Sequence, residues 1–135
     1  METNVNMEEY STIRMRATGA PIYLTVSASS VLFNKGCLAA LGQPDYAKIL
    51  IANNKDTLLV IPSDQDDSDS IFFSKEGKTY FRINSHYFAK SLLKYVNVNC
   101  GRDVDSKVTL KIPGKIPSNI EGLLFEFKNA EELKK

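Results

Sequence analysis

The order of local patterns between residues 22 and 62 decides the fold. This stretch reads IYLTV (22–26), VLFNKGCLAALG (31–42), YAKILIA (46–52) and TLLVIP (57–62). The first run alternates apolar and polar residues, which is typical of a strand with one buried face. In the second run Asn34 stands at the N-cap of a short helix over 35–41, and Gly42 stands at its C-terminal end. The last two runs read as strands.

Two hairpin turns are predicted from short polar segments. Asn53 to Asp56 separates the strands 46–52 and 57–61, and asparagine tolerates a positive φ, while Pro62 is expected to end the second strand. Lys75 to Lys78 separates apolar runs at 71–74 and 79–83. Each pair of flanking runs is therefore expected to form an antiparallel hairpin.

The same order of elements returns in the second half of the chain. A strand over 79–83 is followed by a helix from Ser85 to Tyr95, capped by Asn84 or Ser85, and then by strands over 107–112 and 123–127. We therefore predict two pseudo-repeated β-α-β-β units, about 22–62 and 79–127.

A unit of this size leaves an apolar face uncovered, and two units related by a pseudo-two-fold axis would close a small barrel with few free edges. The predicted fold class is α+β, mostly β: a small β-barrel of two pseudo-repeated units with two short helices. Residues 1–135 are expected to form a single domain, with residues 1–10 and 129–135 flexible.

Composition excludes several classes of protein. The 135 residues are 43% apolar and 24% charged with a formal charge of +1, which is ordinary for a folded soluble domain. Apolar runs are too short for a membrane span, and the polar start of the chain lacks the features of a secretory signal, so a cytoplasmic location is expected. Cys37 and Cys100 are expected to be reduced.

The chain offers little from which to build an active site or a metal site. It has one histidine, His86, no tryptophan and no glycine-rich loop. A zinc site needs clustered Cys and His ligands, which the sequence does not supply. We therefore expect a protein that is not an enzyme and needs no metal or cofactor.

The strand, capped helix and hairpin of residues 22–62 resemble the looped-hinge-helix hairpin of the AbrB/MazE/MraZ group of bacterial regulators. Where that group has a Gly-Arg entry and a proline, this chain has Ser30-Val31-Leu32-Phe33-Asn34. The resemblance implies a swapped-hairpin barrel and DNA binding as a transcription regulator or antitoxin. The whole chain also looks like small uncharacterised proteins of prophages and mobile elements.

A basic bias in the second half supplies candidate DNA contacts. Nine Lys or Arg residues lie between Lys75 and Lys115, among several aromatic residues, and such a face can bind phosphates by releasing counterions. The first hypothesis is a DNA-binding transcriptional regulator of a phage or mobile element. The residues expected to contact phosphates are Arg14, Arg16, Lys35, Lys78, Arg82 and Lys90.

The alternative hypothesis is a non-enzymatic, phage-encoded inhibitor that binds a host defence protein. Its contact would be an acidic loop that lacks the glycine and glutamate of a calcium-binding loop: Asp64, Asp66, Asp67 and Asp69. The expected partners are thus double-stranded DNA or a host protein, with no membrane and with a possible homodimer.

Overall fold

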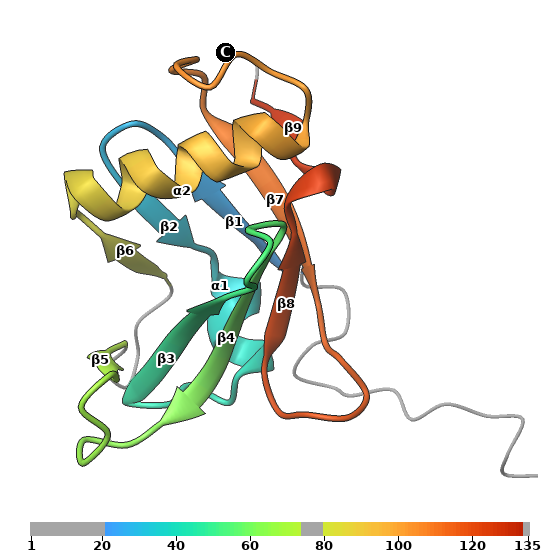
Figure 1. Ribbon diagram of the computed structural model, residues 1–135. Helices are drawn as coiled ribbons and strands as arrows, with labels where there is room; N and C mark the ends of the chain where they lie inside the picture. The colour runs from blue at the N-terminus through green and yellow to red at the C-terminus, as the bar shows by residue number, and fades with distance from the viewer. Residues whose placement is uncertain (1–20, 74–79, 134–135) are drawn as a thin grey trace, which may run out of the picture.

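The computed structural model describes residues 21–73 and 80–133. The chain is mostly β (Figure 1). Its elements follow one another as β1 (Tyr23–Val26), β2 (Val31–Phe33), α1 (Lys35–Ala40), β3 (Tyr46–Ile51), β4 (Thr57–Ser63), β5 (Ile71–Phe72), β6 (Phe81–Ile83), α2 (His86–Asn99), β7 (Leu110–Lys115), β8 (Leu123–Glu126), a 3₁₀ turn (Phe127–Asn129) and β9 (Glu131–Glu132).

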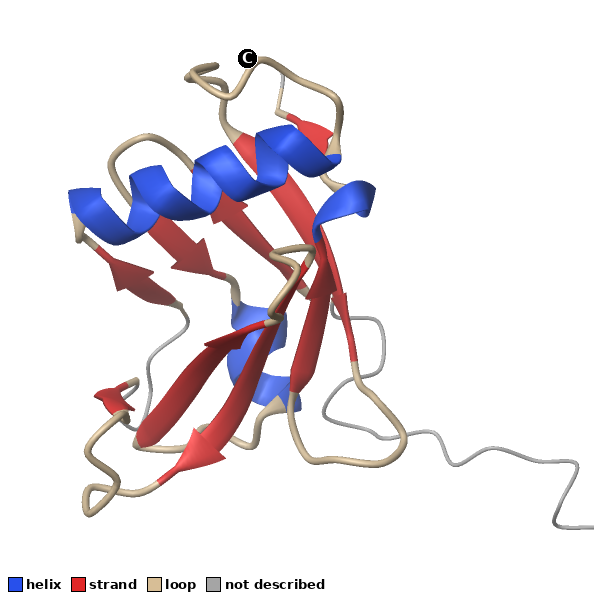
Figure 2. Cartoon of the chain, in the orientation of Figure 1, coloured by secondary structure: helices blue, strands red, loops and turns tan. Residues whose placement is uncertain are grey.

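The strands form one antiparallel sheet that curls into a half-barrel. Its order is β5-β3-β4-β8-β7-β1-β2-β6, and β9 adds to β7 off this path. Figure 2 shows the long helix α2 spanning the open side of the curled sheet, with the short helix α1 below it. The prediction of a mostly β fold with two helices is therefore confirmed, and the sheet is a curled half-barrel.

The core lies on the concave face of this sheet. Alternate residues of each strand point inward, and β1 and β2 bury Leu24, Val26, Val31 and Phe33 completely. Helix α2 presents Ala89, Leu92, Leu93 and Val96 to the same core. Burial of these side chains, at about 25 cal/mol per Å² of apolar surface, is the main force that holds the helix against the sheet.

Aromatic rings bridge the gap between β5 and β6, the first and last strands in the order of the sheet, which do not pair with each other. Phe73 follows β5, and its ring lies 4.6 Å, centroid to centroid, from that of Phe81 on β6. The ring of Phe33 on β2 lies 5.5 Å from Phe73 and 6.1 Å from Phe125. The half-barrel is thus closed at this level by side chains rather than by backbone hydrogen bonds.

The side chain of Asn34 fixes the start of α1 against β1. Its Oδ1 accepts hydrogen bonds from the amides of Cys37 at 3.0 Å and Tyr23 at 3.3 Å, and its Nδ2 donates to the carbonyl of Pro21 at 2.8 Å. The chains approach so closely here that a Cβ on Gly36 would lie 1.9 Å from the Pro21 oxygen. The expected N-cap at Asn34 is confirmed, and it also binds the preceding strand.

Two prolines lie inside strands, contrary to the prediction from sequence. Pro62 was expected to end a strand and Pro113 to begin a loop. Pro62 pairs with Ala47 within β4, which runs on to Ser63. The missing amide of Pro62 faces the β8 side, where pairing stops at Val60 opposite Leu123, so no ladder bond is lost. Pro113 similarly pairs with Tyr23 inside β7, which extends to Lys115.

The turn and helix expectations need three further corrections. The positive φ in the 53–56 turn is at Lys55, not at an asparagine. Helix α2 is capped by the Ser85 hydroxyl and continues past Tyr95 to Asn99, where Gly101 with φ 69° follows its C-cap. The strands on either side of residues 75–78 were expected to pair with each other, and this prediction is wrong, because β5 pairs with β3 and β6 pairs with β2. Residues 74–79 themselves lie outside the described residues.

Replacing Asn34 tests its double role. Asn34→Ala should lower the free energy of unfolding by about 1–3 kcal/mol, because the cap and the bonds to Tyr23 and Pro21 are lost together. Asn34→Asp keeps both acceptor bonds and loses only the donor, so its cost should be about half as large. Urea unfolding measures both, and equal costs for the two variants would contradict the account.

Burial raises the pKa of the Cys37 thiol to about 12. Its Sγ donates a hydrogen bond to the carbonyl of Tyr23 at 3.2 Å. Because the unfolded thiol ionises near pH 8.5 and the folded one does not, the stability that Cys37 contributes falls as pH rises above that value.

The difference in unfolding free energy between wild type and Cys37→Ala should therefore be about 2 kcal/mol smaller at pH 10 than at pH 8. In a Cys100→Ser background, a thiol reagent should label Cys37 only in denaturant. Rapid labelling of the native protein at pH 8 would refute this placement of Cys37.

Candidate nucleic-acid interface

One row of side chains crosses the convex face of the β7-β1-β2-β6 wall. Because Leu24, Val26, Val31 and Phe33 point inward, their neighbours point outward. The register places Lys111 opposite Thr25, Thr25 opposite Leu32, and Leu32 opposite Arg82. With strands about 4.8 Å apart, the two basic ends of this outer row are separated by about 14 Å.

Each basic end of the outer row lies over an aromatic ring. The Lys111 ammonium is 4.2 Å from the centroid of the Tyr23 ring, and the Arg82 guanidinium is 6.0 Å from that of Tyr80. Glu131 of β9 stands opposite Lys111 in register, but the ammonium contacts the Tyr23 ring. Cation–π contacts hold both charges at the surface, where they remain accessible to an anion.

The described DNA-contact candidates lie on three different elements. Lys35 opens α1, Arg82 lies in β6 and Lys90 lies on α2, and all three are exposed. Phe33 pairs with Phe81 and Val31 with Ile83, so α1 and α2 begin at opposite ends of the β2–β6 pair. The structure therefore does not bring Lys35 and Lys90 together. Arg14, Arg16 and Lys78 lie outside the described residues.

Lys90 belongs to a second basic feature, a hollow of about 210 Å³ between α2 and the loop before β7. The hollow is lined by Ala28, Lys90, Leu93, Lys94, Val104, Asp105, Ser106 and Lys107. Nearby, the buried Asn97 ties helix to loop by donating from Nδ2 to the carbonyl of Ser106 at 3.0 Å. Three lysines and one aspartate line this hollow, so its charge is net positive and separate from the outer row.

The acidic loop is ordered by its own side chains. Asp64 Oδ1 accepts from the amides of Asp66 and Asp67, and Asp67 Oδ1 accepts from the amide of Asp69. The other oxygen of Asp67 lies 3.1 Å from the Lys48 ammonium on β3. Asp67 therefore fastens the loop to the sheet, whereas Asp64, Asp66 and Asp69 are exposed to solvent.

The sequence alone did not single out Lys111 and Tyr23, which the structure places in or beside the outer row. Lys111 was counted in the basic bias, but nothing local to it showed which side chains would stand beside it. The pairing of β7 with β1 joins residues more than eighty positions apart. The alternation in residues 22–26 (IYLTV) predicts only that the Tyr23 and Thr25 side chains point to the same, outer face of the strand.

Within residues 21–73 and 80–133, no group of three His, Cys, Asp or Glu side chains is placed to hold a metal ion. No helix in the same described part of the chain has the length and hydropathy needed to cross a membrane.

Comparison with known proteins gives no match to a family model, to a curated protein or to a solved structure.

The Asp67 carboxylate offers a test of the loop. Hydrogen bonds from the Asp69 amide first, and then from Lys48 and Ser63, hold the pKa of Asp67 below its ordinary value of about 3.9. The stability that these bonds contribute is present above that value and is lost as pH falls through the lowered pKa.

NMR titration of the Asp67 carboxyl carbon should give a midpoint below 3.9, and Lys48→Met should raise the midpoint while the bond from the Asp69 amide keeps it depressed. A midpoint that Lys48→Met leaves unchanged would show that the Lys48–Asp67 pair is not formed.

Proposed function

We propose that this protein is a DNA-binding transcriptional regulator, with the outer row as the surface that contacts the phosphate backbone. The observation that carries the proposal is the row itself, in which Arg82 and Lys111 each lie over a tyrosine ring, with Glu131 of β9 next to Lys111. Its span of about 14 Å is close to the width of about 12 Å of the major groove of B-DNA. Such a surface would position the protein on a duplex through phosphates.

The pattern of strand pairing supports the two-unit barrel that the AbrB/MazE/MraZ resemblance implies. Equating β1 with β5, β2 with β6, β3 with β7 and β4 with β8 maps most neighbours in the strand order onto one another. The pairing of β3 with β5 becomes that of β7 with β1, and the β4–β8 and β2–β6 pairings map onto themselves. The β1–β2 and β7–β9 pairings lack a counterpart. Where a β5–β6 pairing would match β1–β2, the rings of Phe73 and Phe81 are in contact instead.

The resemblance also supports the setting that we propose, a cytoplasmic regulator of a phage or mobile element that acts by binding and not by catalysis. Asn34 replaces the proline of that group and caps α1 in its place. Lys35, Lys78 and Lys90 remain candidate phosphate contacts in addition to the outer row.

One observation favours the second candidate, an inhibitor of a host defence protein. Asp64, Asp66 and Asp69 are exposed on a loop whose shape is set by internal hydrogen bonds, so the loop could meet a basic partner with little ordering cost.

Salt-dependent DNA binding tests the first candidate. In fluorescence anisotropy with a 30-base-pair duplex, the wild-type affinity should fall steeply with salt. Arg82→Gln with Lys111→Gln should reduce the slope of log K against log salt by about 1.8, because two phosphate contacts are lost at about 0.9 each.

The matched control removes two charges elsewhere, with Lys115→Gln and Lys128→Gln, whose ammonium groups pair with Glu126. This control should leave the slope unchanged. An equal loss in both double variants, or no binding by wild type at low salt, would reject the outer row as the DNA surface.

A further inference from the structure

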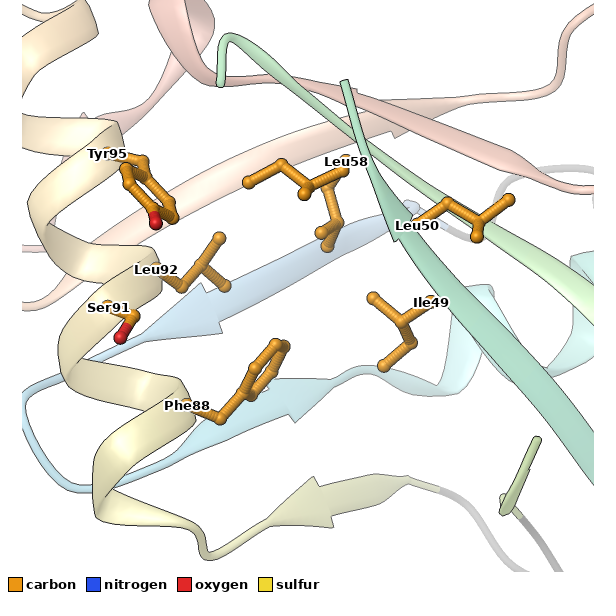
Figure 3. Close-up of a pocket in the computed structure, with 8 residues that line it drawn as sticks. Ile49, Leu50, Leu58, Phe88, Ser91, Leu92 and Tyr95 are labelled. Atoms are coloured by element: carbon orange, nitrogen blue, oxygen red, sulfur yellow. The ribbon is translucent and has the colours of Figure 1, made fainter. Parts of the chain in front are cut away.

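A narrow apolar groove separates β3 from α2, on the side of the half-barrel where the strand order ends (Figure 3). Its volume is about 180 Å³. Ser91 and Tyr95 bring hydroxyl groups to the α2 side, and the other walls are apolar. The residues of this β3–α2 groove are Ile49, Leu50, Ile51, Leu58, Phe88, Ser91, Leu92 and Tyr95.

The β3 backbone bordering the groove is an open strand edge. β5 pairs with β3 only at Tyr46 and Ala47, and no other described strand lies on that side. The amide of Ala52 donates to Thr57 on β4, so alternation points the backbone groups of Ile49 and Ile51 the other way, towards the open edge. An unpaired edge of this kind is a template for one more strand.

The size of the groove favours apolar side chains on an extended backbone. Ligand sites for drug-sized molecules are about 300–1,000 Å³, whereas a cavity of about 150 Å³ lined by aliphatic and aromatic side chains takes one benzene ring. The β3–α2 groove therefore accommodates one or two apolar side chains while the adjoining edge binds the backbone that carries them.

The charge of the neighbouring acidic loop indicates which side chains an added strand should have on its outward face. The acidic loop is held against β3 by the Lys48–Asp67 pair, next to the open edge. Asp64, Asp66 and Asp69 are exposed there and form no ion pair among the described residues. The complementary strand thus has apolar residues alternating with basic ones.

Residues 12–17 of this chain, TIRMRA, have that pattern and lie outside the described residues. Ile13 and Met15 alternate with Arg14 and Arg16. We propose that residues 12–15 of a second copy of this chain add to the open edge of β3 as an antiparallel strand, which ends before the position that β5 fills at Ala47. Met15 stands opposite Ile49, Ile13 opposite Ile51 and Arg14 opposite Leu50, with Arg14 on the side of the acidic loop.

The position of Ile22 favours a second copy as the source of the strand. The Ile22 carbonyl accepts from the amide of Gly114 on β7, so the described chain begins on the β7-β1 wall. On one side β8 and β4 separate that wall from β3, and on the other side β2 and β6 do. β5 also fills the strand position beside Tyr46 and Ala47, next to the groove. Reciprocal exchange between two copies gives a closed dimer with two-fold symmetry.

A disulfide trap tests the register and the origin of the strand together. Residues 14 and 50 would form a non-hydrogen-bonded pair with Cα atoms about 4.5 Å apart, within the range of a disulfide. Arg14→Cys with Leu50→Cys in the full chain should give a disulfide-linked dimer on a non-reducing gel, and neither single variant should. A cross-link within one chain would overturn the second copy as the source, and no cross-link would overturn the docking.

The oligomeric state gives an independent test. Light scattering after size-exclusion chromatography should show a wild-type dimer at micromolar concentration. Met15→Asp should shift it to monomer, because a carboxylate would enter the apolar groove. Thr18→Asp adds the same charge outside the segment and should leave the dimer intact. A monomeric wild type, or a dimer unaffected by Met15→Asp, would contradict the proposal whatever the result of the DNA assay.

Discussion

The three hydrogen bonds of the Asn34 side chain join the beginning of β1 to the first turn of α1. They fix the point at which the chain leaves the β1–β2 hairpin, and so the direction in which α1 carries it to β3. In the same hairpin the inward phase of Leu24 and Phe33 sets the outward phase of Thr25 and Leu32, so one register places both the core and the outer row.

The incomplete closure of the sheet explains why the molecule has two distinct surfaces. β3 and β6 end the antiparallel path, apart from the two residues of β5, and run in the same direction. One antiparallel strand is needed between them, and β5 supplies it for two residues only. The rings of Phe73 and Phe81 fill the gap between β5 and β6. Near Ile49 and Ile51 the gap remains as the groove beside α2. The convex face of the β7-β1-β2-β6 wall carries the outer row, which we propose as the DNA surface.

Local signals predicted the elements well and their limits less well. Asn34, Ser85 and Gly42 mark helix ends because capping is a short-range interaction. Pro62 and Pro113 misled the prediction because a proline is tolerated in a strand wherever no partner needs its amide, and that depends on neighbours distant in sequence. α2 continues beyond Tyr95 because Val96 and Asn97 are buried against elements that follow it.

The candidate site was predictable only in part. Arg82 was identified from charge, but its place at the end of a row with Lys111 depends on the pairings of β2 with β6 and β1 with β7. The acidic loop was identified as one charged segment, whereas the structure gives Asp67 a bond to Lys48 that its neighbours lack. Side chains with the same local sequence context differ because tertiary contacts select among them.

Chemical-shift mapping of the labelled protein with a duplex tests the central claim most directly, since it reports every contact at once. The account predicts shifts concentrated at the amides of Thr25, Leu32, Arg82 and Lys111, with β3 and β4 unaffected. Shifts confined to the hollow around Lys94 and Lys107, or no shifts at low salt, would contradict it.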